Sequence, residues 1–428
     1  MKATRNPFTH KLQMIKAVEK GLQSTKFYTV FLISVILAGI FSLSLAISLP
    51  MNNIIIRSSG IIATILPLHV EGRCIKDSFN NTITLRGVNQ AGFLDDPNGW
   101  WNPEGGTIYS GVGVWNPDAV KYNLDGMKDW GSNVLRLPVT VEWWIENTSD
   151  YRQHIKDTIT WAGERGIYVI LIPWNVIGKG SQTSIPFPPY LTAEEELVIP
   201  SEQAFVDFWA NVATELSAFP NVMFELFNEP HGTAAARDDW FRVTQLCIDA
   251  IRATDIDQII IVQWNYGIWV NLSFPPPPPP TPTSPGRGAT MDWVEIYPIN
   301  DSLGNIVYSF HNYRGDFHRT IPTRVNVWEY DDIKAALQYA WVDYVLNTLN
   351  KPVLCGEIGA NMWRTGEGLT QELAYFKNSL TIYNELNISY IAWVWTIPAH
   401  MQHGLLQNAL WLPPPTAAGE ILIASMRP

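Results

Sequence analysis

A chain of 428 residues is long enough for one large domain or for two to three domains of average size. Its 40 acidic residues outnumber the 29 basic ones, and the formal net charge of −11 leaves no basic surface for nucleic acid. Only 16% of the residues are charged, whereas 19 are tryptophan, more than a core of this size needs. We therefore expect a compact body with long surface loops and no nucleic-acid partner.

The N-terminal region has the pattern of a targeting or anchoring segment. Residues 1–26 carry six Lys or Arg and one acidic residue, and residues 27–49 form an apolar run long enough to span a bilayer as a helix. The basic flank predicts a cytoplasmic tail followed by a transmembrane anchor, with a cleaved signal sequence as the alternative. Residues 50–65 are then a spacer, and the remainder is extracellular, either secreted or held at the membrane surface.

Two further features bear on the compartment of the protein. Five Asn-X-Ser/Thr tripeptides are compatible with export, at Asn80, Asn147, Asn271, Asn300 and Asn387. The three cysteines, Cys74, Cys247 and Cys355, lie far apart in the chain and show no metal-ligand spacing. They are either small unpaired core residues or include one Cys74–Cys247 bridge.

From residue 66 onward the chain alternates between strand-like and helix-like segments. Two short alternating runs between Leu66 and Leu85 flank Asp77–Asn81 and predict a hairpin. Strand-like runs then end near Asn89, Pro138, Pro173, Glu229, Gln263, His311, Glu357 and Trp395. Helix-like segments are expected at about 117–130, 151–165, 201–218, 235–253, 329–349, 370–386 and 418–426.

This succession predicts one α/β domain over residues 66–428, a (β/α)8 TIM barrel with long βα loops. Continuous apolar runs such as 169–172 and 259–262 suit strands that are buried on both faces of a parallel sheet. A doubly wound open sheet is the alternative, but no Gly-rich phosphate loop follows the first strand. A domain boundary at the proline-rich run 274–285 would leave five strands on one side and three on the other, and neither set could close a barrel. We therefore interpret the run as an insertion within the barrel.

Two strand ends carry carboxylates. The run Val222–Pro230 is apolar until it presents Asn228 and Glu229 and stops at a proline, and Pro352–Gly359 presents Glu357. Because the C-terminal ends of barrel strands converge, these side chains are expected at one rim. A pair of carboxyl groups there is the minimal set for acid-assisted cleavage of a glycosidic bond.

Strand alternation predicts which neighbours share a face with each carboxylate. Glu229 is expected on the same face as Glu225 and Phe227, and Glu357 on the same face as Cys355 and Val353. The same rim should carry Arg136, His311, Tyr313, Trp393 and Trp395, each at the end of a predicted strand.

Six segments in this order resemble glycoside hydrolase family 5, the cellulase family of the retaining clan A barrels, over about residues 67–412. They are Leu85–Asn89, Asn133–Pro138, Phe224–His231, Ser309–Tyr313, Gly356–Gly359 and Trp393–Thr396. The resemblance implies Glu229 as acid/base and Glu357 as nucleophile. It also implies that Arg136, Asn228, His311, Tyr313, a strand-eight tryptophan and Asn89 line the subsite of cleavage. For that tryptophan we favour Trp395, with Trp393 as the alternative.

One position departs from the family pattern. Where the family usually ends strand three with His, this chain reads Ile172–Asn175, and Trp174 takes that place. The departure bears on the substrate and the subfamily rather than on the carboxylate pair. Further tryptophans that follow strands offer flat surfaces for sugar rings.

We therefore expect a retaining endo-β-1,4-glucanase that acts on cellulose-like chains as a monomer, without a metal or organic cofactor. Its partner is a β-linked polysaccharide or oligosaccharide, besides the membrane contacted by the N-terminal segment. A β-mannanase or other β-glycanase would share the mechanism, an exo-acting β-glucosidase would favour aryl glucosides, and a non-catalytic cell-surface carbohydrate-binding protein would keep the tryptophans alone.

Overall fold

The computed structural model describes residues 65–98, 114–178, 183–264, 291–314, 329–396, 401–407 and 414–427. The predicted basic tail 1–26, the predicted anchor or signal sequence 27–49 and the proline-rich run 274–285 lie outside these residues, as does the spacer up to residue 64. Among the helices of the described ranges, none is both long and apolar enough to cross a bilayer.

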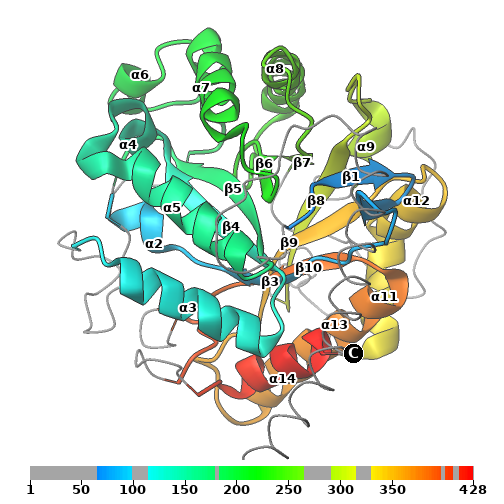
Figure 1. Ribbon diagram of the computed structural model, residues 1–428. Helices are drawn as coiled ribbons and strands as arrows, with labels where there is room; N and C mark the ends of the chain where they lie inside the picture. The colour runs from blue at the N-terminus through cyan, green and yellow to red at the C-terminus, as the bar shows by residue number, and fades with distance from the viewer. Residues whose placement is uncertain are drawn as a thin grey trace, which may run out of the picture. The chain divides into compact units, whose positions relative to one another are not determined.

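Eight parallel strands close into a barrel in the order β10-β3-β4-β5-β6-β7-β8-β9, which confirms the predicted (β/α)8 architecture (Figure 1). The strands are β3(Arg86–Asn89), β4(Val134–Thr140), β5(Tyr168–Asn175), β6(Val222–Glu225), β7(Ile260–Gln263), β8(Ile306–Tyr313), β9(Val353–Gly359) and β10(Ser389–Ala392). The proline-rich run lies between β7 and β8 in the chain, and these two strands pair with each other in the same barrel.

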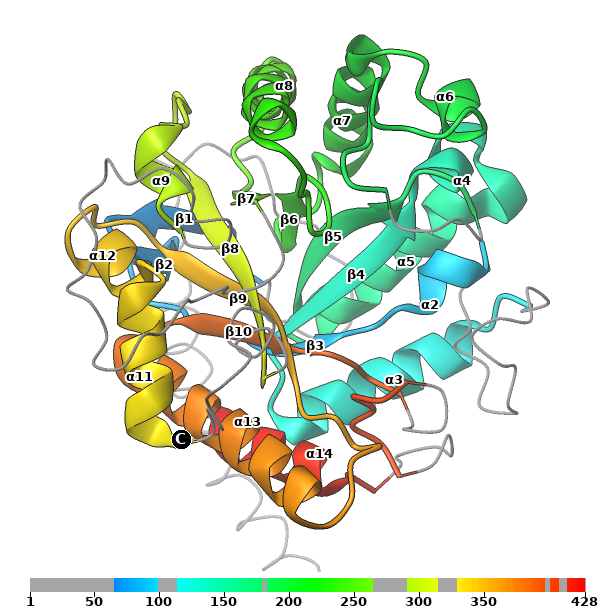
Figure 2. The ribbon, with the colours of Figure 1, turned by 180° about the vertical axis from the view of Figure 1, so that it is seen from behind.

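Helices surround the strands, as the view from behind also shows (Figure 2). The longer ones are α3(Pro117–Trp130), α5(Tyr151–Glu164), α7(Glu202–Leu216), α8(Ala234–Arg252), α11(Tyr330–Tyr339), α13(Gly366–Leu386) and α14(Ala417–Met426). Shorter segments are α2(Gly92–Asp95), α4(Val141–Glu146), η2(Thr148–Asp150), α6(Glu195–Val198), α9(Trp293–Ile296) and α12(Val342–Asn347). The single helix expected over 329–349 is two helices, because the backbone at Trp341 is left-handed (φ 70°) and ends α11.

Local sequence signals explain where the helices begin and end. At the start of α3 the Asn116 side chain accepts a hydrogen bond from Ala119 N, and Pro117 occupies the first helical position. Gly131 follows the helix with φ 100°, a left-handed conformation that glycine adopts without strain. These signals place both ends of α3 where the sequence predicted them.

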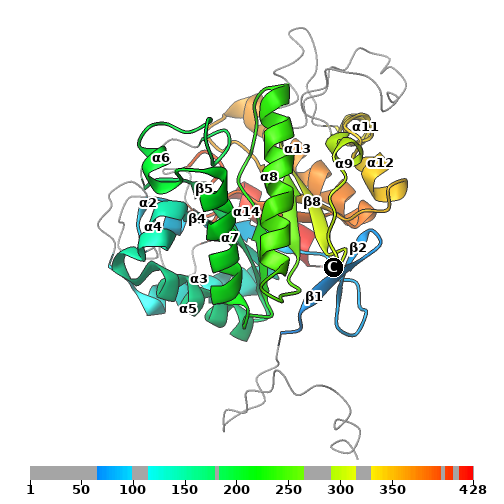
Figure 3. The same cartoon turned by 90° about the horizontal axis from the view of Figure 1, so that it is seen from above.

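The N-terminal hairpin closes one end of the barrel. Strands β1(Leu68–Glu71) and β2(Cys74–Asp77) pair in antiparallel fashion around Gly72, where φ is 58°. The predicted turn at Asp77–Asn81 is also present, because Ile83 N donates to Ile75 O across it and Lys76 and Thr82 form an antiparallel bridge. The β1–β2 hairpin that precedes it was not predicted separately. In Figure 3 the hairpin lies far from α6, on the other side of the view, and α7 and α8 lie side by side.

The interior of the barrel changes from apolar to polar along its axis. Near the hairpin it is filled by an apolar cluster that includes Leu68, Val134, Met223, Ile261, Val307, Leu354 and Ile391. Because side chains on a strand alternate between faces, the residue two positions further along points inward again. On β4, β6, β7 and β8 this residue is Arg136, Glu225, Gln263 and Ser309, all of them buried. A polar layer therefore lies directly below the C-terminal mouth.

The cysteines do not form a bridge. Cys74, Cys247 and Cys355 are all free, and the last two are buried. The Cys74–Cys247 alternative is therefore wrong. Cys247 and Cys355 are small core residues, whereas Cys74 is half-buried.

Candidate active site

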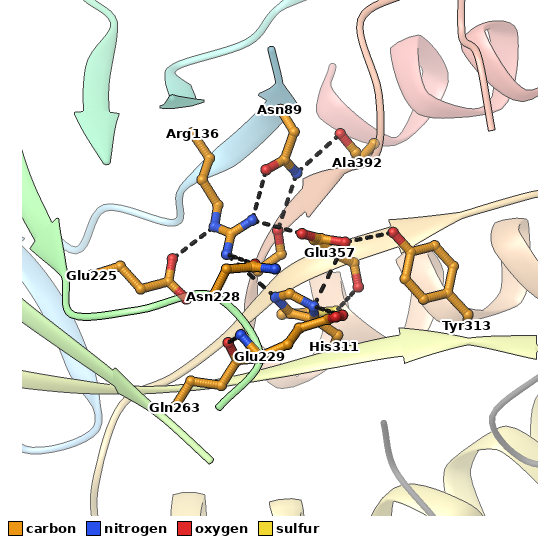
Figure 4. A network of polar contacts seen from close by, with 12 residues as sticks. Asn89, Arg136, Glu225, Asn228, Glu229, Gln263, His311, Tyr313, Glu357 and Ala392 are labelled. Carbon is orange, nitrogen blue, oxygen red and sulfur yellow. Dashed lines mark hydrogen bonds and ion pairs between the residues drawn. The ribbon is translucent and has the colours of Figure 1, made fainter. Parts of the chain in front are cut away.

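The two predicted carboxylates meet at the C-terminal mouth of the barrel (Figure 4). Glu229 follows β6 by four residues, and Glu357 lies within β9. One carboxylate oxygen of each residue and a ring nitrogen of His311 all lie within 4.8 Å of one another. The side chain of Glu229 keeps 18% of its surface exposed, whereas that of Glu357 keeps only 3%. The pair therefore consists of one carboxylate that faces solvent and one that is enclosed.

The backbone of Glu229 is left-handed, and this conformation turns its side chain into the site. Its φ of 50° is rare for a residue other than glycine and costs about 1–3 kcal/mol. Glu225 shares the inward face as predicted, but Phe227 does not. Because regular alternation stops where β6 ends, the Phe227 ring packs outward against Phe205 and Trp240.

An irregularity in β9 aims Glu357. His311 on β8 pairs with Glu357, and the preceding Phe310 pairs with Cys355, so one extra residue is inserted at Gly356. This bulge shifts the side-chain alternation. The predicted shared face of Glu357 with Cys355 and Val353 was therefore wrong, because both of these side chains lie in the outer core with the helices.

Arg136 links most of the site. Its Nε lies 2.7 Å from Oε2 of Glu225, and its Nη1 lies 2.8 Å from Oε1 of Glu357. Two amides complete the set, because Nη1 donates to Asn89 Oδ1 at 2.9 Å and Nη2 donates to Asn228 Oδ1 at 2.8 Å. Burial acts to lower the pKa of the guanidinium, but Glu225 and Glu357 outweigh it, and the pKa is raised. A permanent positive charge therefore lies beside Glu357.

Asn89 contacts the protein rather than the open mouth. Its side chain is fully buried, and Nδ2 donates to the carbonyls of Gly356 and Ala392. It thereby joins Arg136 to the bulge of β9 and to β10. Asn228 is tied to the neighbouring strand, because its backbone N–H donates to Pro173 O at 3.0 Å.

His311 and Tyr313 complete the surroundings of the carboxylates. His311 Nδ1 lies 2.8 Å from Oε1 of Glu229, and its Nε2 lies 3.5 Å from the donor Nη2 of Arg136. Because Nε2 faces a donor, the ring proton is on Nδ1 and is donated to Glu229. The hydroxyl of Tyr313 donates to Oε2 of Glu357 at 2.8 Å.

Electrostatics separates the groups by protonation state. Burial lowers the pKa of His311 to about 4, and Arg136 contributes in the same direction against the opposing effect of Glu357. The ring is therefore neutral near pH 7. Burial raises the pKa of Glu357, while Arg136 and the Tyr313 hydroxyl limit that rise by stabilising the ionised form.

Two tryptophans form a wall at the mouth. Trp174 is the last residue but one of β5, and its ring stacks on Trp393 with 4.8 Å between the ring centroids. Trp393 belongs to the same small apolar cluster as Leu94 and is packed by Tyr313. Trp174 and Tyr313, whose hydroxyl donates to Glu357, both pack against this cluster.

Trp395 does not line the site. Its indole Nε1 donates to Asn123 on α3 at 2.9 Å, and its ring packs on Trp130. The chain turns after Val394, where Thr396 N donates to Val394 O, so alternation no longer holds. The preference for Trp395 was therefore wrong, and the alternative, Trp393, is the residue at the mouth.

Sequence reasoning assigned no role to two residues of the polar layer. Glu225 was predicted only to share a strand face with Glu229, and Gln263 was predicted only to lie at the end of a strand. Gln263 is buried, and its Oε1 accepts a hydrogen bond from Glu229 N at 3.0 Å. The available signal was one polar residue within each apolar strand run, since buried polar groups need partners.

Glu229, His311 and Glu357 are also the group of described residues whose spacing could suit a metal ion. Their atoms have other partners, because His311 donates to Glu229 and Tyr313 donates to Glu357. The three side chains are therefore held by one another and by Tyr313.

A closed (β/α)8 barrel with a carboxylate pair at its C-terminal mouth is the architecture of the TIM-barrel glycoside hydrolases. The model of the cellulase family, glycosyl hydrolase family 5, matches residues 94–398, and the chain belongs to this family.

Relatives and solved structures agree with this assignment. An endoglucanase of Clostridium saccharobutylicum is 25% identical over 262 residues, which cover 60% of this chain and 46% of the relative. Endoglucanase E-5 of Thermobifida fusca is 26% identical over 194 residues, 45% of this chain and 34% of the relative. The chain thus spans less than half the length of these curated relatives. The solved hyperthermophilic endocellulase of Pyrococcus horikoshii, 21% identical, shares the fold with a TM-score of 0.63, over 85% of this chain and 99% of that one.

Proposed function

We propose that the protein is a retaining endo-β-1,4-glucanase that cleaves cellulose-like chains by double displacement. The observation that carries the proposal is the oxygen-to-oxygen separation of at most 4.8 Å between Glu229 and Glu357. Retaining glycosidases hold their carboxyl groups about 5–5.5 Å apart, whereas inverting enzymes need about 6.5–9.5 Å to admit a water molecule. The names of the endoglucanase relatives and a Pyrococcus horikoshii endocellulase complex with cellotetraose support a β-glucan substrate.

In the first step Glu357 attacks the anomeric carbon while Glu229 protonates the leaving glycosidic oxygen. Glu357 is suited to attack because Arg136 and Tyr313 hold its two oxygens at 2.8 Å each and fix their direction. Glu229 is suited to proton transfer because its side chain is partly exposed toward the mouth. The result is a covalent glycosyl-enzyme and a free reducing-end fragment.

In the second step Glu229 removes a proton from water, which hydrolyses the glycosyl-enzyme and restores Glu357. The neutral His311 ring donates to Glu229. It can keep this hydrogen bond as the carboxylate gains and loses a proton. Two inversions at the anomeric carbon give net retention.

The Trp174–Trp393 wall is proposed to bind the sugar at the cleavage site. Flat indole rings stack on the apolar C–H faces of pyranoses. Tyr313 packs against the small cluster that contains Trp393, and Trp174 extends the same surface by stacking on Trp393.

Azide rescue tests the two carboxylate roles. Glu357→Ala should abolish turnover, and added azide should restore activity on an activated aryl cellobioside with an inverted glycosyl azide as product. Glu229→Ala with azide should instead give a retained product, because Glu357 still forms the intermediate. Folded variants without rescue, or with the two stereochemical outcomes exchanged, would contradict the assignment.

The polymer is tested with soluble glucan, mannan and xylan. An endo-acting β-1,4-glucanase lowers the viscosity of a soluble cellulose derivative before much reducing sugar appears. Faster cleavage of mannan or xylan would make the protein another β-glycanase, and tight binding without new reducing ends would make it a carbohydrate-binding protein.

We also propose that residues 27–49 export the barrel and either remain as a membrane anchor or are cleaved as a signal sequence. The basic residues of 1–26 followed by the apolar run support this proposal. Expression of the full chain followed by fractionation and N-terminal sequencing of the mature protein tests it. A soluble, uncleaved chain inside the cell would contradict it.

A further inference from the structure

Gln263 lies at the end of β7, directly below the acid/base residue (Figure 4). It is 1% exposed, and its side-chain Oε1 accepts a hydrogen bond from the backbone N–H of Glu229 at 3.0 Å. Its own backbone carbonyl accepts from Trp240 Nε1 at 2.9 Å, which anchors the residue to α8. Gln263 is therefore fixed on one side by a buried indole and contacts Glu229 on the other.

The regular ladder between β6 and β7 stops just before the active site. Phe224 N donates to Ile259 O, and Leu226 N donates to Ile261 O. In a parallel pair the next bond would join Asn228 N to Gln263 O. Instead Asn228 N donates to Pro173 on β5, and Gln263 O is taken by Trp240.

The side chain of Gln263 replaces the missing ladder acceptor one residue later. The N–H that it binds belongs to the residue whose φ of 50° turns the carboxylate into the site. A backbone N–H is an obligatory hydrogen-bonding group, and this contact satisfies it while holding the peptide plane that precedes the Cα of Glu229. The other polar atom of the amide, Nε2, has no hydrogen-bond partner among the described residues, so the visible polar contact of the side chain is made by its oxygen.

We propose that Gln263 is a positioning residue for the acid/base: by accepting the Glu229 N–H it holds the peptide plane from which the left-handed Glu229 directs its carboxylate at the glycosidic oxygen. This inference rests on the proposed glycosidase function. Gln263 itself touches no reacting atom.

The test uses substrates that differ in their need for an acid. Hydrolysis of a cello-oligosaccharide requires protonation of a poor leaving group, whereas a dinitrophenyl β-cellobioside releases its phenolate without it. In Gln263→Met, which keeps length and volume but removes the acceptor, kcat/KM on the cello-oligosaccharide should fall about 10- to 100-fold, part of the 10²–10⁴-fold that general acid catalysis supplies. On the dinitrophenyl substrate kcat/KM should change less than about threefold, while kcat and KM both fall because Glu229 also assists the second step.

Two further variants separate positioning from folding. Ser309→Ala is the matched control, since Ser309 is buried, pairs in register with Gln263, and has no hydrogen-bond partner among the described residues for its hydroxyl. It should leave both substrates unaffected. Gln263→Glu keeps an acceptor oxygen and should retain the leaving-group profile, with the Glu229 limb of the pH profile moved to higher pH by the added negative charge.

The outcomes distinguish this inference from the proposed function. A wild-type protein that cleaves neither substrate nor any β-glycan overturns the proposed function itself. An active wild type whose Gln263→Met variant loses activity equally on both substrates, or on neither, overturns the positioning role alone. If Gln263→Met does not fold, a Gln263→Glu variant that is impaired only on the cello-oligosaccharide overturns it too.

Discussion

Arg136 and Glu225 form an ion pair that is enclosed inside the barrel, with Nε and Oε2 2.7 Å apart and neither side chain exposed. The same guanidinium holds Glu357 at 2.8 Å, so the two carboxylates share one positive charge. Glu225 therefore determines how much of the charge of Arg136 acts on Glu357.

Glu225→Gln should lower the free energy of unfolding by about 3–5 kcal/mol, because it breaks a buried ion pair. In the folded enzyme the charge of Arg136 then acts more strongly on Glu357, which lowers the pKa of that carboxyl and weakens it as a nucleophile. We expect a smaller kcat and an acid limb of the pH–activity profile at lower pH, measured together with urea unfolding. Glu71→Gln, which removes an exposed pair with Lys76, is the control and should change neither quantity measurably.

Gly356 is expected to tolerate no side chain. A Cβ there would lie 2.9 Å from Ser309 Oγ and 3.1 Å from Nε2 of His311, so in Gly356→Ala the serine hydroxyl must move and the histidine that contacts Glu229 must give way by a few tenths of an ångström. Overpacking of this kind costs about 1–3 kcal/mol of stability, and kcat should fall with it. Gly368→Ala in α13 is the matched control, since its nearest neighbour would be 3.7 Å away, and it should raise stability by up to about 1 kcal/mol. Unchanged activity in Gly356→Ala would show that the bulge has more room than the contacts indicate.

Acid should destabilise the fold through His311. Its pKa is lowered from 6.5 to about 4 by burial, so between these values the unfolded chain binds a proton that the folded chain does not. Stability therefore falls as the pH is lowered from about 6.5 to 4, by on the order of 3 kcal/mol from this group. Unfolding free energies measured at several pH values should show this slope, and His311→Gln should reduce it. An identical slope in the variant would assign the pH dependence to other groups.

Trp174 and Trp395 should respond differently to substitution. Trp174→Ala removes half of the stacked wall and should raise KM for cello-oligosaccharides about tenfold, equivalent to about 1.4 kcal/mol of binding. Trp395→Phe loses the bond to Asn123 and should lower the melting temperature while KM stays constant. Trp174→His restores the residue type usual in the family, and a change in preference among glucan, mannan and xylan would identify this position as a determinant of specificity.

The sequence determined the barrel and the residues of its mouth. Apolar runs of strand length, separated by helices whose caps are encoded locally, as at Asn116 and Gly131 of α3, specify parallel strands buried on both faces. Convergence of strand ends then follows from the closed topology, which is why Glu229, Glu357, Arg136, His311 and Tyr313 could be predicted to meet.

Only the tertiary structure decided which way the decisive side chains point. Alternation predicts faces only while a strand is regular, and it fails at the left-handed Glu229, at the bulge of Gly356 and at the turn after Val394. Each irregularity depends on contacts with distant segments, such as Gln263 Oε1 on Glu229 N and Asn89 Nδ2 on Gly356 O. Such long-range hydrogen bonds leave no periodic trace in the sequence. Only the folded chain therefore shows that Trp393 rather than Trp395 lies at the mouth, and what Glu225 and Gln263 contact.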